Sequence, residues 1–206
     1  MYFDSTSLTT LHYRQFLEAP VSGSKGPAAQ GSLIFLCAGS EEIFGNATVQ
    51  ASLKAMGKST HYFGKDVGGG TRAKLVVNSL MGTMMVAFSE SLTLAESVGL
   101  DGNKMLEVIS QGAIATPMYN LKGSKMLKKD HTPNFPLQHA HKDMKLAVDM
   151  AKETKVEYAV TEKAEELFQK ARSDKELKIA EQDFSAVFES IHKESNSQYS
   201  KKRRLE

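Results

Sequence analysis

Residues 64–98 read GKDVGGGTRAKLVVNSLMGTMMVAFSESLTLAESV, and this stretch decides the fold. A glycine-rich turn comes first, and from residue 71 to residue 98 the chain then holds no proline and one glycine, Gly82. Apolar residues recur over that range at helical spacing, so the pattern predicts one helix about 40 Å long. We expect this helix to join two regions of different character.

The region before the helix alternates between extended and helical patterns. An apolar run at residues 33–38 predicts a buried strand, residues 41–56 predict a helix that Gly57 closes, and residues 60–63 predict a second strand. A strand, a helix and a strand in this order are typical of the end of an α/β sheet.

The region after the long helix is helical throughout. We expect one helix that Asp101 caps and that ends near Gln111, and a last helix at residues 184–192 that Asp183 caps. Between them the pattern predicts helices at residues 137–154 and 160–173. The chain is therefore expected to have three parts, which are residues 1–70, residues 71–193 and a disordered basic tail at residues 194–206.

Composition excludes several classes of protein. The 206 residues carry a formal charge of +2, which gives no reason to expect nucleic acid or an acidic membrane surface as a partner. A single cysteine, Cys37, forms no internal disulfide and lies in an apolar run, which favours a buried thiol. No stretch reaches the roughly 20 apolar residues that span a bilayer. His139 and His141 diverge on a helix because they are two residues apart, and we assign no metal.

The glycine-rich turn leads into a helix whose first turns carry Lys74 and Asn78. These two residues are four apart, so they share one face of the helix. Three consecutive glycines from Gly68 leave the backbone bare, so another molecule or another chain segment can come close. The simpler interpretation is an exposed helix start with a solvated lysine. The turn lacks the G-x-G-x-x-G order of a dinucleotide site.

A second feature is the segment EAPVSG at residues 18–23. The Ser22–Gly23 turn follows a strand and offers a hydroxyl group and free backbone N–H groups, which suit a carboxylate ligand. Taken alone, the segment is only a tight turn.

Together the two features resemble the β-hydroxyacid dehydrogenase family, which includes 3-hydroxyisobutyrate dehydrogenase and the glyoxylate/succinic semialdehyde reductases. The family's catalytic motif is G-x-x-x-G-x-G-x-x-x-K-x-x-x-N. It is matched in full by residues 64–78. Blocks at residues 134–137 (NFPL), 142–147 (KDMKLA) and 183–187 (DFSAV) fit as well. The resemblance runs from residue 16 to residue 192 and is strongest to the plant-type reductases and to their nuclear relative.

The resemblance implies a fold and a cofactor. The fold would be an α+β remnant of a Rossmann-type α/β domain, followed by an all-α domain of the 6-phosphogluconate dehydrogenase C-terminal type, with the long helix as the link. The cofactor would be NADP or NAD. The reaction would convert a small hydroxy acid or semialdehyde.

Roles for individual residues follow from the resemblance. Lys74 would be the general acid or base at the carbonyl oxygen, and Asn78 would orient the substrate or Lys74. The turn formed by Ser22, Gly23 and Ser24 would hold the substrate carboxylate.

Three more residues would complete the site. Phe135 would form a wall of the pocket, and Lys142 would reach the cofactor, with Asp143 beside it as a contact to the substrate. Without the family, the Lys142–Asp143 pair would be interpreted as a surface charge pair on a helix.

The sequence also departs from the family. Members begin with a G-x-G-x-x-G strand, turn and helix, but here only 15 residues precede Phe16. Met1–Thr6 is similar to a strand near the end of the family's cofactor domain. We therefore expect a chain that binds nicotinamide cofactor poorly and is inactive alone, as a truncated isoform, a partial gene product or a shortened expression product would be.

Two functions remain open. The first is a reductase of small carboxylate-bearing aldehydes, expected in the cytoplasm. The second is a non-catalytic module that forms homo-oligomers through the helical domain, with the basic run Lys201–Arg204 as a nuclear or chromatin signal. For that run a solvated terminus is the simpler interpretation.

Overall fold

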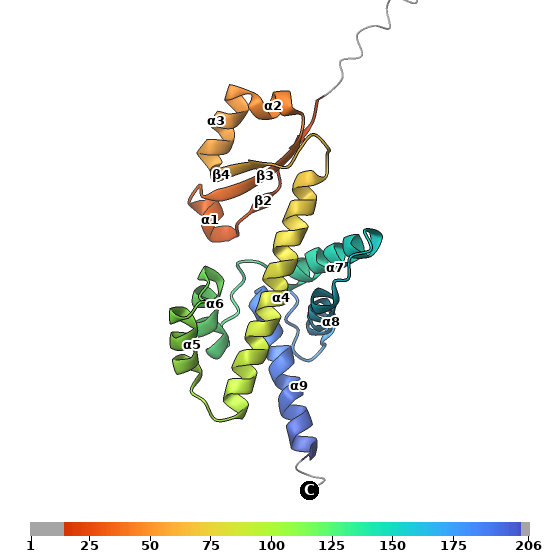
Figure 1. Cartoon of the computed structure of the whole chain (residues 1–206). Helices are drawn as coiled ribbons and strands as arrows, with labels where there is room; N and C mark the ends of the chain where they lie inside the picture. Colours follow the sequence, from red (N-terminus) through yellow and green to blue (C-terminus); the bar gives the residue numbers. More distant parts are fainter. Residues whose placement is uncertain (1–14, 203–206) are drawn as a thin grey trace, which may run out of the picture. The chain divides into compact units, whose positions relative to one another are not determined.

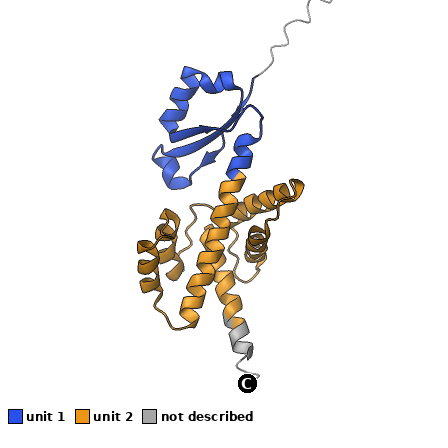
Figure 2. Cartoon of the chain, viewed as in Figure 1, with its two compact units in different colours: residues 1–74 blue, residues 75–206 orange. Residues whose placement is uncertain are grey.

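The computed structural model describes residues 15–202. The chain divides into two compact units, residues 1–74 and residues 75–206 (Figure 2). The boundary falls inside helix α4 (Gly69–Ser97), and each unit is described by itself. The strand at Met1–Thr6 expected by resemblance lies outside the described residues.

Unit 1 is built on a small mixed sheet with β3 (Leu33–Gly39) at its centre (Figure 1). Strands β1 (Leu17–Glu18) and β2 (Val21–Ser22) pair antiparallel with β3 in one continuous register. Strand β4 (Gly57–Tyr62) pairs parallel with β3. The predicted strand at residues 33–38 is confirmed, and the second predicted strand starts earlier than expected, at the glycine taken for a helix cap.

Three short helices accompany the sheet, which are α1 (Lys25–Ala29), α2 (Glu41–Gly45) and α3 (Ala47–Met56). The single helix predicted over residues 41–56 is wrong, because the chain breaks at Asn46. The Asn46 side chain accepts hydrogen bonds from the backbone N–H groups of Thr48 and Val49 and so starts a new helix. Phe35, Cys37 and Leu53 form the buried core of this unit.

The long helix is confirmed as α4, which has 29 residues. In unit 2 its inner face buries Met85, Phe88 and Leu92. Among the described residues α4 is the one helix long and apolar enough to cross a membrane by length and composition, which the sequence analysis did not expect. The core helix of a globular domain has the same composition, and the buried inner face accounts for it here.

Unit 2 consists of helices that share one core with α4. They are α5 (Gly102–Gln111), α6 (Pro117–Leu127), α7 (Leu137–Glu153), α8 (Ala159–Ser173), the 3₁₀ turn η2 (Phe184–Ala186) and α9 (Val187–Lys202). Figure 1 shows α5 beside α6 and α7 beside α8, and both pairs are in contact. The buried side chains of these helices form a single cluster.

Two elements of unit 2 differ from the prediction. Helix α6 was not predicted. Its start carries a recognisable signal, because Thr116 accepts the Tyr119 N–H and Pro117 opens the helix. Helix α9 continues to Lys202, although a disordered tail was predicted from residue 194. Glu194 pairs with Lys170 of α8, which holds this turn of α9 in place. Arg203 and Arg204 lie outside the described residues.

Candidate functional site

The glycine-rich turn holds a carboxylate of the chain itself. Glu18, at the end of β1, accepts hydrogen bonds from the backbone N–H groups of Gly68 at 2.6 Å and Gly70 at 2.8 Å. Its other oxygen accepts the Thr71 hydroxyl at 2.8 Å. Burial raises the pKa of Glu18, but the hydrogen bonds from Thr71, Gly70 and Gly68 outweigh it and the pKa is lowered. Glu18 is therefore ionised at neutral pH.

Gly70 is required for close packing. A Cβ atom on this residue would lie 2.0 Å from the Leu36 carbonyl oxygen of β3. The bare backbone thus lets a neighbouring strand come close, and no space for a side chain remains. The sequence left open whether another molecule or another segment of the chain approaches this turn. In the structure a chain segment, strand β3, does so.

The candidate substrate turn lies at the edge of β3. Ser22 pairs with Ile34 in the sheet, Gly23 has a φ of +130°, and Ser24 precedes α1. Within residues 15–202 the hydroxyl groups of Ser22 and Ser24 make no hydrogen bond. The turn therefore offers two unengaged hydroxyl groups that can donate to a carboxylate.

Lys74 is half-buried in the first turns of α4. Its ammonium group makes no hydrogen bond or ion pair with any residue that the structure describes. Lys74 and the substrate turn both belong to unit 1.

Unit 2 brings three of the predicted residues together. Asn78 donates its Nδ2 to Asp143 Oδ2 at 2.6 Å, and Lys142 Nζ lies 2.7 Å from Asp143 Oδ1. Asp143 is buried, whereas Lys142 is exposed. Because a carboxylate only accepts, the amide of Asn78 must present its nitrogen to Asp143. The amide oxygen of Asn78 therefore points elsewhere and stays available.

Phe135 lies at the rim of the core of unit 2, where its ring meets Phe184 edge to face at 6.0 Å between centroids. Its backbone is fixed by Asp183, which accepts the N–H groups of Asn134 and Phe135. Both Asp183 oxygens also receive the Lys122 ammonium at 2.7 Å.

Lys122 and Asp183 form a buried ion pair that the sequence analysis missed. Their side chains are 5% and 2% exposed. Asp183 accepts the Ser185 N–H at 3.2 Å, as a cap should, but its main partner is Lys122. Burial raises the pKa of Asp183, yet the Lys122 hydrogen bond and the backbone donors outweigh it and lower the pKa overall. No sequence signal marks Lys122, because it lies in the helix that was not predicted.

Two histidines have partners that the sequence did not reveal. His141 bonds Glu165 at 2.8 Å and Arg172 at 3.1 Å, and His131 bonds Glu189 at 3.0 Å. In the part of the chain that the structure describes, no three histidine, cysteine or acidic side chains gather in a way that could hold a metal ion.

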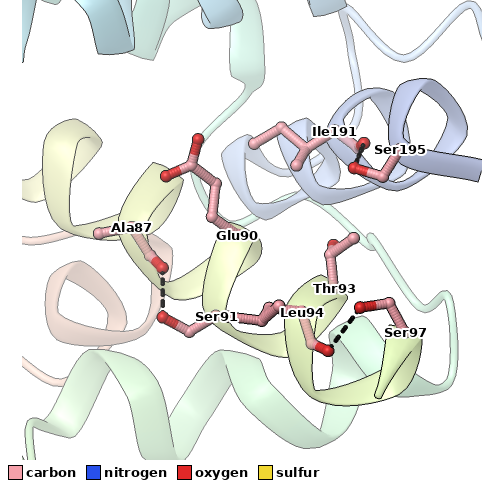
Figure 3. Close-up of a pocket in the computed structure, with 8 residues that line it drawn as sticks. All are labelled: Ala87, Glu90, Ser91, Thr93, Leu94, Ser97, Ile191 and Ser195. Carbon is pink, nitrogen blue, oxygen red and sulfur yellow. Dashed lines mark hydrogen bonds between the residues drawn. The ribbon is translucent and has the colours of Figure 1, made fainter. Parts of the chain in front are cut away.

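A hollow of about 510 Å³ lies in unit 2, where α4 meets α9 (Figure 3). None of the candidate residues lines it. Ser91, Ser97 and Ser195 bond back to carbonyl groups of their own helices, as the dashed lines for this hollow show. Only the Thr93 hydroxyl oxygen is buried without a hydrogen bond among the described residues. Glu90 is the one ionisable residue among those that line the hollow, and no candidate residue lies near it there.

The described residues do not fit the pyrophosphate of a dinucleotide. In the described part of the chain, two helices in unit 1 follow a β-strand at the carboxyl end of the sheet. The first, α2, carries Glu41 and Glu42 in its first turn, which repel an anion. At the start of the second, α4, Glu18 already accepts the N–H groups of Gly68 and Gly70.

Comparison with protein-family models gives two matches. Residues 68–191 match the NAD-binding domain of NADP-dependent 3-hydroxyisobutyrate dehydrogenase. Residues 7–64 match the NAD-binding domain of 6-phosphogluconate dehydrogenase.

Curated relatives agree with these matches. Glyoxylate/succinic semialdehyde reductase 2, chloroplastic, of Arabidopsis thaliana is 47% identical over 176 residues, which cover 85% of this chain and 48% of the relative. Reductase 1 of the same plant is 44% identical, over 86% of this chain and 59% of the relative. The cytokine-like nuclear factor N-PAC of Aedes aegypti is 33% identical, over 84% of this chain and 30% of the relative. The chain thus spans between 30% and 59% of the length of these relatives.

Solved structures show the same similarity. The 3-hydroxyisobutyrate dehydrogenase of Salmonella typhimurium superposes with a TM-score of 0.76 at 26% identity, over 85% of this chain and 60% of that protein. The enzyme of the same name from Mycobacterium tuberculosis, solved with L-serine, gives a TM-score of 0.72 at 26% identity, over 85% and 60%.

Proposed function

The chain belongs to the β-hydroxyacid dehydrogenase family, whose members depend on NAD(P), and from this membership we propose that it carries the substrate-binding and proton-transfer residues of a small-aldehyde reductase. The substrate class is an aldehyde or keto acid with a carboxylate, such as glyoxylate or succinic semialdehyde. The reverse reaction would oxidise a hydroxy acid of the 3-hydroxyisobutyrate type.

The observation that carries the proposal is the hydrogen-bonded row of Asn78, Asp143 and Lys142. A surface charge pair would not need a buried carboxylate with both oxygens engaged. Asp143 fixes the orientation of the Asn78 amide group, so that the amide oxygen of Asn78 is left to accept a hydrogen bond. We assign Asp143 to this positioning role rather than to direct substrate contact, because its oxygens already have partners.

Lys74 supplies the proton in this reaction. As the carbonyl carbon gains a hydride, its oxygen gains negative charge, and the Lys74 ammonium donates a proton to that oxygen. The product is the hydroxyl group, and the neutral amine takes up a proton from water. A nicotinamide dinucleotide supplies the hydride in this family. Asn78, one helical turn after Lys74, orients the substrate oxygen or the ammonium group.

Ser22 and Ser24 hold the substrate carboxylate. Their hydroxyl groups are unengaged within the described residues, and the φ of Gly23 turns the backbone between them. Phe135 would form an apolar wall, and the exposed ammonium group of Lys142 would contact the cofactor.

We infer that this chain alone binds the cofactor weakly, because Glu18 and the acidic start of α2 occupy or repel the phosphate positions in unit 1. A titration of the purified chain with NADPH and with NADH, followed by calorimetry, tests this inference. Absence of binding up to millimolar concentration is expected. Micromolar binding would contradict it.

Turnover tests the assignment of Lys74. Because the chain alone is expected not to bind NADPH, turnover is measured with the chain joined to the cofactor-binding domain of a family member, and NADPH oxidation in the presence of glyoxylate should disappear in Lys74→Ala. Lys65→Ala is a matched control, since Lys65 is exposed and its ion-pair partner among the described residues, Glu41, is exposed too. Equal loss in both variants, or none in Lys74→Ala, would contradict a role of Lys74 in proton transfer.

A second candidate function is an oligomerisation module. On α4 in unit 2, Leu80 and Leu94 are 59% and 63% exposed, and Val98, directly after the helix, is 63% exposed. We interpret these exposed apolar side chains as part of a protein contact. Phe88 of the same helix faces the core of unit 2 instead. We propose a homo-oligomer through this face, with no membrane or nucleic acid as partner.

Cellular location remains part of the proposal. We place the protein inside the cell, in the cytoplasm. The names of the relatives include one chloroplastic and one nuclear protein. Tagged full-length protein imaged in cells tests this, and an Arg203→Ala/Arg204→Ala variant tests whether the basic run directs it to the nucleus.

A further inference from the structure

Glu18 joins two segments that lie far apart in the sequence. Its partners Gly68 and Thr71 are 50 and 53 residues away. On one side Glu18 ends β1, which pairs with β3 at Ala38. On the other side it receives the N–H group of Gly68, just before α4, and that of Gly70, in the first turn of α4. The carboxylate is thus the polar link between the first strand segment and the start of the long helix, within unit 1.

The chemistry of this link is that of a helix cap. The first N–H groups of a helix have no acceptor within the helix, and the helix dipole favours a negative charge at that end. Glu18 meets both needs at once from another element. Its bonds to Gly68 and Gly70 are charge-assisted, and the Thr71 hydroxyl fixes the second oxygen. With both oxygens engaged, the carboxylate has one orientation.

Candidate site residues follow each end of the link within a few positions along the chain. Three residues after Glu18 the chain enters β2, which ends at Ser22. Three residues after Thr71 lies Lys74. The Cβ that Gly70 lacks would also lie 3.3 Å from Pro20 Cδ. Both the substrate turn and Lys74 are therefore held by backbone that Glu18 and Gly70 bring together.

We propose that Glu18 is a positioning residue, which sets the distance between the carboxylate-binding turn at Ser22 and the proton donor Lys74. The role rests on the proposed function above. Glu18 touches neither substrate nor the reacting atoms. It acts through the backbone of β1 and β2 on one side and the first turn of α4 on the other.

The proposal is tested with Glu18→Ala and Glu18→Gln in the full chain, with Glu41→Gln as the matched control. Glu41 is an exposed glutamate of the same unit that pairs with exposed Lys65. Two properties are measured. One is amide hydrogen exchange at residues 68–72, and the other is affinity for glyoxylate, followed by NMR shifts of the Ser22 and Lys74 amides.

In Glu18→Ala we expect exchange at residues 68–72 to rise at least about tenfold and glyoxylate affinity to fall at least about tenfold. Exchange in α7 and α8 of unit 2 should not change. Glu18→Gln keeps one acceptor oxygen and loses the charge, so its effect should be smaller. Glu41→Gln should match the wild type. If Glu18→Ala does not fold, Thr71→Val removes a single bond of the link and should give a smaller loss in both measurements.

Different failures are distinguishable. If the wild-type chain binds no glyoxylate, the proposed function fails and the positioning role fails with it. If the wild type binds glyoxylate and Glu18→Ala binds it equally well, only the positioning role is overturned. Faster exchange with unchanged glyoxylate affinity also overturns it, because Glu18 would then be a helix cap and nothing more.

Discussion

Replacing Lys122 by methionine should destabilise unit 2 strongly. The ammonium group lies 2.7 Å from both oxygens of Asp183, and the two side chains are 5% and 2% exposed. Methionine fills a similar volume but leaves the Asp183 charge buried without its cation. Loss of one partner from a buried pair costs about 3–5 kcal/mol. Three backbone N–H groups, from Asn134, Phe135 and Ser185, still reach Asp183, so the expected loss is about 3 kcal/mol.

Urea unfolding followed by far-ultraviolet circular dichroism measures this loss, because unit 2 is almost wholly helical. Asp183→Asn alone leaves a buried ammonium and should also be costly. The double variant Lys122→Met/Asp183→Asn removes both charges of the pair. Its loss in free energy of unfolding should therefore be smaller than the sum of the two single losses by about 2 kcal/mol or more. Lys163→Met is the control, since Lys163 and its partner Glu166 are exposed, and it should not shift the unfolding midpoint.

The dependence of the free energy of unfolding on pH in the acid range gives a second measurement. The pKa of Asp183 is lower in the folded protein than its ordinary value, so its ionisation stabilises the fold above that ordinary value. This contribution is lost as the pH falls through the folded pKa, below about pH 4. In Lys122→Met the pKa should rise, so that acid unfolding begins at higher pH. A loss under about 1 kcal/mol in Lys122→Met, or additive single losses within about 0.5 kcal/mol, would refute the reasoning.

Three further outcomes are expected. Asn78→Asp should place a carboxylate against buried Asp143 and lower the free energy of unfolding at pH 7 by about 1–3 kcal/mol, with recovery at lower pH; an unchanged urea midpoint would count against the hydrogen bond. The Cys37 thiol is fully buried, and burial together with the charge of Glu18 raises its pKa, so an aromatic disulfide reagent should react at least about a hundredfold more slowly with folded than with urea-unfolded protein; equal rates would contradict this. Leu80→Glu with Leu94→Glu should shift any oligomer to monomer in sedimentation without changing the helical spectrum, and an oligomer that persists would exclude this face of α4.

Local pattern was sufficient for the secondary structure of most of the chain. The apolar spacing of residues 71–98 predicts α4 within two residues, and the apolar run at 33–38 predicts β3. Asp101 caps α5 as its residue type suggests, with its Oδ1 accepting the Asn103 N–H at 2.7 Å. Such features depend on neighbours within a few positions, which a sequence displays directly. The break at Asn46 and the start of α6 at Thr116 are local too, and both carry capping residues that a stricter interpretation would have used.

The sequence determined which residue types make up the candidate site, but not which of them meet in space. By itself the sequence indicated the family and the residue types of the site, including Lys74 and Asn78, because the motif spacing is a local property. Only the tertiary structure decided the partners: Asn78 with Asp143 across 65 residues, Glu18 with Gly68 across 50, and Lys122 with Asp183 across 61. Any carboxylate in the chain could satisfy a buried ammonium or a helix start. Which one does so depends on which elements meet in space, and that is fixed by packing rather than by spacing along the chain.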